Sequence, residues 1–187
     1  MKPTVPGPNT DYLKPTAILD FHLGYDGDIP NNPLPLLIYQ GAIKLPDRDP
    51  AGFVEKLLAA NQWGESWRDG IYSYAHYHST AHEVLAIFSG SARVHFGGRN
   101  GIAQTLRAGD VVIIPAGVAH KRHGASLDFA VVGAYPVGQH WDMCYGRPEE
   151  RAEADQNILH VPLPKADPVY GPQGPLMERW GVTTSGR

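Results

Sequence analysis

The stretch that decides the fold runs from residue 70 to residue 90 and reads GIYSYAHYHSTAHEVLAIFSG. Its spacing is Gly-x5-His-x-His-x4-Glu-x6-Gly, where x is any residue. His76 and His78 stand two residues apart, and alternate side chains of a strand share one face of the sheet. Glu83 opens the next apolar run after a short link. The stretch therefore predicts two strands that direct two imidazoles and a carboxylate toward one interior.

A second stretch, residues 109–120, reads GDVVIIPAGVAH and ends in another histidine, His120. If the sheet closes on itself, this imidazole can meet the side chains of the first stretch. Three imidazoles and one carboxylate suit a divalent metal ion, and this donor set accepts Fe, Mn, Ni or Zn. The sequence thus predicts a site for one such ion, without choosing among them, and its ligands are His76, His78, Glu83 and His120.

The composition points the same way. The 187 residues include 21 Gly and 17 Pro, about one residue in five against a usual share of about one in eight. This excess argues against a helix bundle and favours many short strands joined by turns. Nine histidines accompany a single cysteine, which excludes an internal disulfide framework and a Cys-based zinc cluster.

Charge and hydropathy exclude several partners. The net charge is −3, and no basic stripe of the kind that nucleic-acid binders carry is visible. No apolar run approaches the roughly 20 residues that cross a bilayer, and the first residues lack the apolar core of a secretory signal. We expect a cytoplasmic protein with neither nucleic acid nor membrane among its partners.

Turn residues divide the chain into short elements. Asp49 and Pro50 suit the N-cap and the first position of a helix that ends near Asn61. The Asn-Gly pair within residues 97–101 marks a hairpin. The other expected elements are an extended arm at 1–15, strands at 17–23, 34–45, 71–77, 83–88, 92–96, 102–106, 111–114, 119–123 and 127–135, a short helix at 148–159, and an extended Pro-rich segment at 161–175.

Strands at this spacing, without a long helix between them, predict an all-β antiparallel barrel or sandwich. A short N-terminal helix and extended terminal arms complete the expected fold. We expect a single domain over 1–187, with the barrel core at about 70–136, an N-terminal extension at 1–69 and a C-terminal wrap at 137–187.

The two stretches resemble the two defining motifs of the cupin superfamily. A chance match over this chain is on the order of 10⁻⁴ for the first motif and 10⁻² for the second. The second motif often ends in Asn four residues past its histidine, where this chain has Gly124; in the family that Asn is not a metal ligand. Three segments look more narrowly like the small YjlB-type cupins, namely HYHSTAHEVL (76–85), SGSA (89–92) and VVGAYP (131–136).

The resemblance implies a cupin-type double-stranded β-helix, or jelly-roll barrel, that binds a metal and pairs as a homodimer. It implies no substrate. The terminal arms are plausible material for exchange between the two copies.

The parity of side chains along the strands suggests what surrounds the metal. Tyr72 and Tyr74 share parity with His76, while Arg122 shares it with His120. A pocket of Tyr74, Leu85, Ile87 and Arg122 would be mostly apolar with a few polar groups, as small-molecule sites usually are. Arg122 can hold a substrate carboxylate or phosphate, or else make a surface salt bridge. Tyr74 is either a general acid or a packing residue. The candidate catalytic residues are Glu83, Tyr74 and Arg122, with Glu83 as a base.

Other conspicuous residues have plainer interpretations. His82 neighbours Glu83 and should face away from the metal, and His95 and His123 are expected at the surface or in hydrogen-bond networks. The sequence places Trp63, Trp67 and Trp141 in the core or at an interface rather than in the pocket. Cys144 is expected to be inert.

Two classes of function remain open. The first is a metal-dependent enzyme acting on a small organic molecule, either a dioxygenase or a Lewis-acid isomerase or decarboxylase. The alternative is a non-catalytic metal- or ligand-binding module, in which the protein is a sensor or the metal is structural. The chain has no Gly-x-Ser-x-Gly elbow, P-loop or Gly-x-Gly-x-x-Gly motif to support another chemistry.

Overall fold

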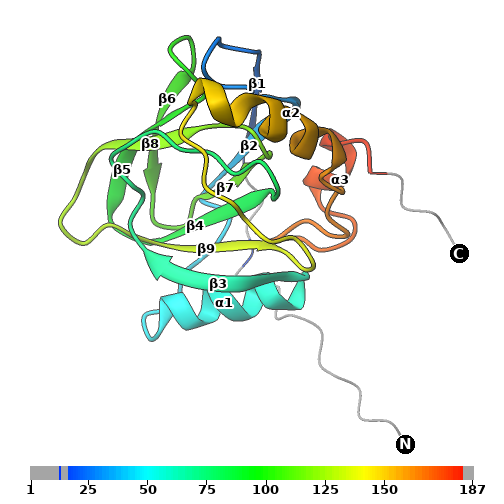
Figure 1. Ribbon diagram of the computed structural model, residues 1–187. Helices are drawn as coiled ribbons and strands as arrows, with labels where there is room; N and C mark the ends of the chain where they lie inside the picture. Colours follow the sequence, from blue (N-terminus) through cyan, green and yellow to red (C-terminus); the bar gives the residue numbers. More distant parts are fainter. Residues whose placement is uncertain (1–12, 14–16, 183–187) are drawn as a thin grey trace, which may run out of the picture.

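The computed structural model describes residue 13 and residues 17–182. The predicted arm at 1–15 lies outside the described residues except for Leu13, which bridges Ile43. The described strands form a six-stranded antiparallel sheet, in the order β1-β2-β7-β4-β9-β3, and a three-stranded sheet, in the order β6-β5-β8 (Figure 1). The strands are β1 (Ala17–Leu23), β2 (Asn32–Gln40), β3 (Trp63–Asp69), β4 (Glu83–Ser89), β5 (Ser91–Phe96), β6 (Ile102–Arg107), β7 (Val111–Ile114), β8 (His120–Ala125) and β9 (Ala130–Pro136).

The six-stranded sheet is buried on both faces. On β7, Val112 and Ile114 belong to the apolar cluster between the two sheets, whereas Val111 and Ile113 belong to a second cluster on the opposite face. This alternation follows from the two-residue period of a strand. Because both faces are covered, β4 and β7 read as continuous apolar runs. The all-β class predicted from the sequence is confirmed.

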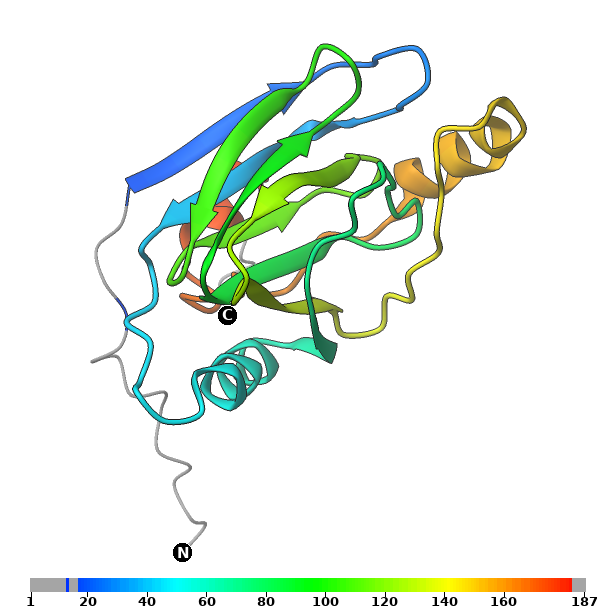
Figure 2. The ribbon, with the colours of Figure 1, turned by 90° about the vertical axis from the view of Figure 1, so that its left-hand side faces the viewer.

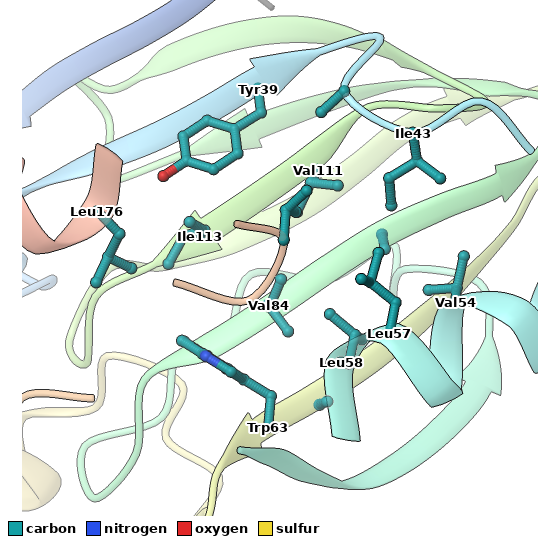
Figure 3. Packing of buried hydrophobic residues seen from close by; sticks show 14 of the residues in the cluster. Tyr39, Ile43, Val54, Leu57, Leu58, Trp63, Val84, Val111, Ile113 and Leu176 are labelled. Carbon is teal, nitrogen blue, oxygen red and sulfur yellow. The ribbon is translucent and has the colours of Figure 1, made fainter. Parts of the chain in front are cut away.

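Helix α1 (Pro50–Ala60) forms where the sequence predicts a helix, and its buried apolar residues pack in the outer cluster of the large sheet. The Asp49 side chain caps it by accepting a hydrogen bond from the Gly52 amide at 3.0 Å, and Pro50 occupies its first turn. Figure 3 shows Leu57 and Leu58 of this helix directed toward Val84 in the outer cluster. The helix thus closes one side of the fold, and Figure 2 shows it well away from the second long helix, α2.

The predicted strand at 71–77 is wrong. Residues 70–75 have no regular structure, and only His76 and Tyr77 make isolated bridges, to His120 and Cys144. The edge strand is instead β3, which runs from Trp63 to Asp69 and pairs with β9. Alternating tyrosines gave residues 71–77 a strand-like pattern, but the hydrogen-bonding edge of β9 is already occupied by β3.

A β-bulge interrupts β3. Gly64 pairs with Tyr135 and Trp67 with Gly133, so three steps along β3 match two along β9. Glu65 adopts a positive φ of 50° at this point. One extra residue reverses the faces of all later side chains. As a result Trp63 packs in the outer cluster, whereas Trp67 packs against the cluster between the sheets.

The C-terminal wrap is tied firmly to the sheet. It contains a 3-10 turn (Pro148–Glu150), α2 (Arg151–His160) and α3 (Pro175–Arg179), which confirms the helix expected at 148–159. Asp167 is fully buried and accepts hydrogen bonds from the Tyr39 hydroxyl at 2.6 Å and from the Leu176 amide at 3.1 Å. The segment expected to be extended at 161–175 therefore turns back around this carboxylate, with a bridge between Asp167 and Gly171. None of the helices in the described part of the chain is long and apolar enough to cross a bilayer.

Candidate metal centre

The four predicted metal ligands meet at one point of the barrel interior. His76 and His78 lie in the link after β3, Glu83 begins β4 and His120 begins β8. Ligand atoms of the three histidines all lie within 4.8 Å of one another, and all three residues are buried, so the triad can hold a metal ion. Oε2 of Glu83 lies 3.5 Å from Nε2 of His78 and 3.3 Å from Nε2 of His120.

Backbone contacts fix the imidazoles. His76 and His120 exchange backbone hydrogen bonds of 3.3 and 2.9 Å. Nδ1 of His78 contacts the carbonyl oxygen of Asp142, and Nδ1 of His76 lies 3.3 Å from that of Tyr74. Because a carbonyl oxygen can only accept, both Nδ1 atoms carry the proton. Each Nε2 therefore keeps a free lone pair, and this is the arrangement that orients metal-ligating histidines.

The donor set fits a cation. Within the described residues, Oε2 of Glu83 is buried and has no hydrogen-bond donor. A buried carboxylate oxygen without a donor is unfavourable unless a positive charge compensates it. Two atoms that each lie about 2.1 Å from a shared ion are separated by roughly 3.0–3.4 Å. The separations of Glu83 from His78 and His120 are close to that range.

The protonation states also suit a cation. Burial opposes the charge on Glu83, but the imidazoles of His78 and His120 outweigh it and hold the pKa of the carboxyl at about 2. Burial lowers the pKa of His120 to about 3, and it also lowers the pKa of His76. His78 is the exception, since the adjacent Glu83 raises its pKa even though burial acts against it. An ionised carboxylate and neutral imidazoles are the forms that coordinate a metal.

A hydrogen-bond chain supports Glu83 through its second carboxylate oxygen, Oε1. The hydroxyl of Tyr135 donates to Oε1 of Glu83 at 3.2 Å, and Nε1 of Trp67 donates to the Tyr135 oxygen at 3.0 Å. Burial and the charge of Glu83 raise the pKa of Tyr135, which keeps the phenol protonated. The sequence analysis missed Tyr135, although its parity with Val131 on the predicted last strand places it inside the barrel.

A cavity of about 430 Å³ leads from the surface to the metal ligands. The indoles of Trp67 and Trp141 form part of its wall, so the expectation that they lie outside the pocket is wrong. The bulge in β3 redirects Trp67, and the wrap carries Trp141. Trp63 is buried in the core, as expected. The lining residues are Glu65, Trp67, Arg68, Asp69, Gly70, Ile71, Tyr72, His76, His78, Glu83, Leu85, His120, Tyr135, Trp141 and Met143.

Two comparisons of sequence identify the family. The model "Cupin domain" matches residues 68–131. The chain is also 44% identical over 156 residues to the uncharacterized protein YjlB of Bacillus subtilis (strain 168). That alignment covers 83% of this chain and 92% of the relative. The chain belongs to the cupin family. The jelly-roll architecture expected from its two motifs is therefore confirmed.

Solved structures resemble this cupin over part of its length. An 11S globulin from Wrightia tinctoria is 20% identical, with a TM-score of 0.34. The match covers 42% of this chain and 21% of the globulin, and the coverages below are given in the same order. Acireductone dioxygenase from Bacillus anthracis is 16% identical, with a TM-score of 0.38 and coverages of 51% and 64%. A mutant oxalate decarboxylase from Bacillus subtilis is 20% identical, with a TM-score of 0.36 and coverages of 60% and 28%. The chain thus spans less than two thirds of each of these proteins.

Of the four residues predicted to form the pocket, the structure places one in the cavity wall. Leu85 is part of the cavity wall, while Ile87 is buried in the core between the sheets. Tyr74 and Arg122 are not among the wall residues. The ring of Tyr74 stacks on that of Tyr72 with centroids 4.7 Å apart. Nε of Arg122 donates to the carbonyl oxygen of Ile71 at 3.0 Å. The Arg122 side chain therefore holds the backbone of Ile71, which is a wall residue.

His82, His95, His123 and Cys144 lie outside the ligand cluster, as the sequence analysis expected. His82 faces away from the metal ligands, since its Nδ1 accepts a hydrogen bond from the Ala116 amide at 3.0 Å. Nε2 of His95 contacts the carbonyl oxygen of Gly98 at 2.8 Å, and its ring lies 5.8 Å from that of His123. Cys144 is buried, and burial raises the pKa of its thiol to about 12.

Proposed function

We propose that this cupin is a metal-dependent enzyme that acts on a small organic molecule. Its metal is one divalent ion, Fe, Mn, Ni or Zn, held by His76, His78, Glu83 and His120. The observation that carries the proposal is that the ligand cluster lies at the wall of a cavity of about 430 Å³. Structural metal sites are closed by protein, whereas catalytic sites keep a position open to substrate. A cavity of this size is typical of sites for small molecules.

Each part of the site has a task in such a reaction. When bound, the ion supplies either a common site for substrate and dioxygen or a Lewis acid that polarises a substrate carbonyl. Tyr135 and Trp67 hold the Glu83 carboxylate in one orientation through their hydrogen bonds. Glu83 is the predicted base, although a pKa of about 2 makes its carboxylate a weak proton acceptor near neutral pH. The indoles of Trp67 and Trp141 give the cavity apolar surface beside the ligand cluster.

Tyr74 and Arg122 remain predicted catalytic residues, although their placement supports a less direct role. Tyr74 stacks on Tyr72, which lines the cavity, and Arg122 holds the carbonyl oxygen of Ile71. Kinetics of Tyr74→Phe and Arg122→Gln separate the two roles, because loss of a proton donor lowers kcat, whereas a displaced wall raises KM.

Metal analysis tests the proposal. Protein purified without added metal, and protein reconstituted with each of the four ions, should hold close to one equivalent. His120→Ala should lose it, while the matched variant His123→Ala should keep it. Dioxygen uptake with candidate substrates then separates an oxygenase from a Lewis-acid enzyme. Failure of the wild-type protein to bind any of the four ions would refute the proposal. Metal binding with a ligand that is retained but never converted would favour the non-catalytic module.

We also propose that the chain forms a single domain over 1–187, pairs as a homodimer and acts in the cytoplasm. The buried Asp167 supports the first point, because it fastens the C-terminal wrap to β2. Light scattering at a mass twice that of the chain would support the dimer, and a monomer mass would exclude it.

A further inference from the structure

The cavity wall carries an unusual amount of exposed aromatic surface. Tyr72 is 48% exposed and Trp141 is 47% exposed, yet both line the cavity beside the metal ligands. Large aromatic side chains contribute much of the surface that a protein buries when it binds another molecule. Two half-exposed rings that face the same concave site therefore indicate a surface that an occupant covers.

The rings are arranged around the ligand cluster. Trp141 lies nearly parallel to Tyr135, at 23° with centroids 6.1 Å apart, and meets the ring of His78 edge-on at 5.7 Å. Tyr72 meets the ring of His76 edge-on at 5.3 Å. Aromatic rings thus adjoin two of the predicted metal ligands. A flat ring could stack on the faces of these rings while its substituents point to the metal.

The charges of the wall argue against a highly anionic occupant. Among the described wall residues other than histidine, Arg68 is the basic one, and Glu55 engages it through two hydrogen bonds of 2.7 Å. Glu65 and Asp69 add negative charge to the wall. A phosphorylated or polycarboxylate ligand needs cationic side chains to hold its charge, and this wall offers none that is unengaged. The remaining attraction for an anionic oxygen is the metal itself.

We infer that the site binds a planar aromatic molecule that bears one small oxygen chelating group and no phosphate. The ring stacks between Trp141 and Tyr72, and the oxygen atoms reach the metal. The inference rests on the proposed function, since it needs a metal held by the histidines and Glu83. It goes further by naming the class of substrate.

Hydroxamic acids test the inference, because one chelating group can be attached to different bodies. Benzohydroxamic, cyclohexanecarbohydroxamic and acetohydroxamic acid are titrated into the metal-loaded protein, and binding is followed by calorimetry and by quenching of tryptophan fluorescence. We expect benzohydroxamic acid to bind about tenfold more tightly than acetohydroxamic acid. It should also bind severalfold more tightly than the cyclohexane compound, which has a similar size but is not flat.

Variants test whether the cavity wall causes the preference for the phenyl compound. Trp141→Leu should remove most of the preference for the phenyl ring, and Trp141→Phe should restore part of it. Leu127→Ala is the matched control, since Leu127 is fully exposed and lies outside the cavity wall. Metal content is measured in every sample.

The outcomes separate this inference from the proposed function. Bound metal with equal affinity for the phenyl and cyclohexyl compounds would overturn the aromatic class, as would a preference unchanged in Trp141→Leu. Bound metal that accepts no hydroxamic acid would also overturn it. Absence of metal from the wild-type protein would instead overturn the proposed function.

Discussion

Removal of the Tyr135 hydroxyl should weaken metal binding without altering any metal ligand. In the structure that hydroxyl is the donor to Oε1 of Glu83, and it also accepts from Nε1 of Trp67. Tyr135→Phe keeps the ring and deletes only the oxygen. Glu83 is 2% exposed, so water cannot readily replace the lost donor. The carboxylate becomes free to rotate away from the geometry that the metal requires.

Two estimates give the size of the effect. Changes to groups that hydrogen-bond to metal ligands typically weaken metal affinity by about 10- to 100-fold. Hydrogen bonds to charged groups contribute about 1.5–3 kcal/mol, which corresponds to a similar range. The Tyr135–Glu83 distance of 3.2 Å is long for a hydroxyl donor, whose bonds are usually about 2.5–3.0 Å. We therefore expect a loss of about tenfold in metal affinity, measured by competition with a chelating dye.

Tyr39→Phe is the matched control. Its hydroxyl donates at 2.6 Å to another buried carboxylate, that of Asp167, on the outer face of the sheet. Both variants should lower the free energy of unfolding, but only Tyr135→Phe should change the affinity for metal. The reasoning is refuted if Tyr135→Phe binds metal within twofold of wild type. It is equally refuted if Tyr39→Phe loses as much affinity as Tyr135→Phe.

Three further predictions concern the fold. Gly133→Ala should destabilise the protein by about 1–3 kcal/mol in urea, because its Cβ would lie 2.1 Å from Cζ2 of Trp67; unchanged stability would contradict the bulge geometry. Asp167→Asn should cost about 1–3 kcal/mol of unfolding free energy, since the amide nitrogen cannot accept from the Leu176 amide, and a smaller loss would mean that the wrap is held elsewhere. Alkylation of Cys144 by iodoacetamide at pH 8 should be about a thousandfold slower in the native protein than in urea, because its pKa is raised to about 12 and thiolate forms only at higher pH; comparable rates would show that the thiol is accessible.

The convergence of His76, His78, Glu83 and His120 could be predicted from the sequence because the spacing within two short motifs indicates it. His76 and His78 are two residues apart, and both reach the candidate site although they lie in a link where His76 makes only an isolated bridge to His120. Glu83 begins β4 and His120 begins β8, and the packing of the two sheets against each other brings their side chains together. Helix α1 could also be predicted from the sequence, since Asp49 suits the N-cap and Pro50 suits the first position of a helix.

The cavity wall could not be predicted in the same way, because it depends on where a bulge interrupts the two-residue alternation of side chains along β3. Trp63 and Trp67 share parity, yet the bulge at Glu65 sends them to opposite faces of the sheet. Gly64 is of a residue type that often marks a bulge, but it does not by itself fix where the bulge falls or which face Trp67 takes. Trp141 enters the wall through a long-range contact of the wrap, in which the Thr80 hydroxyl donates to the His140 carbonyl oxygen at 2.7 Å. Such contacts are decided by tertiary packing rather than by pattern.

Shared contacts nevertheless link the predicted metal ligands to the cavity wall. The carbonyl oxygen of Asp142 orients His78, while its carboxylate binds the amide of Ser79 at 2.6 Å. Asp142 follows Trp141 directly in the chain, so the contacts that aim a metal ligand also set the position of an aromatic wall residue. A substrate that displaces Trp141 must therefore strain the orientation of His78, and a metal that fixes His78 must in turn steady the wall. Metal binding and recognition of the organic ligand are thus expected to be cooperative, since each orders contacts that the other needs.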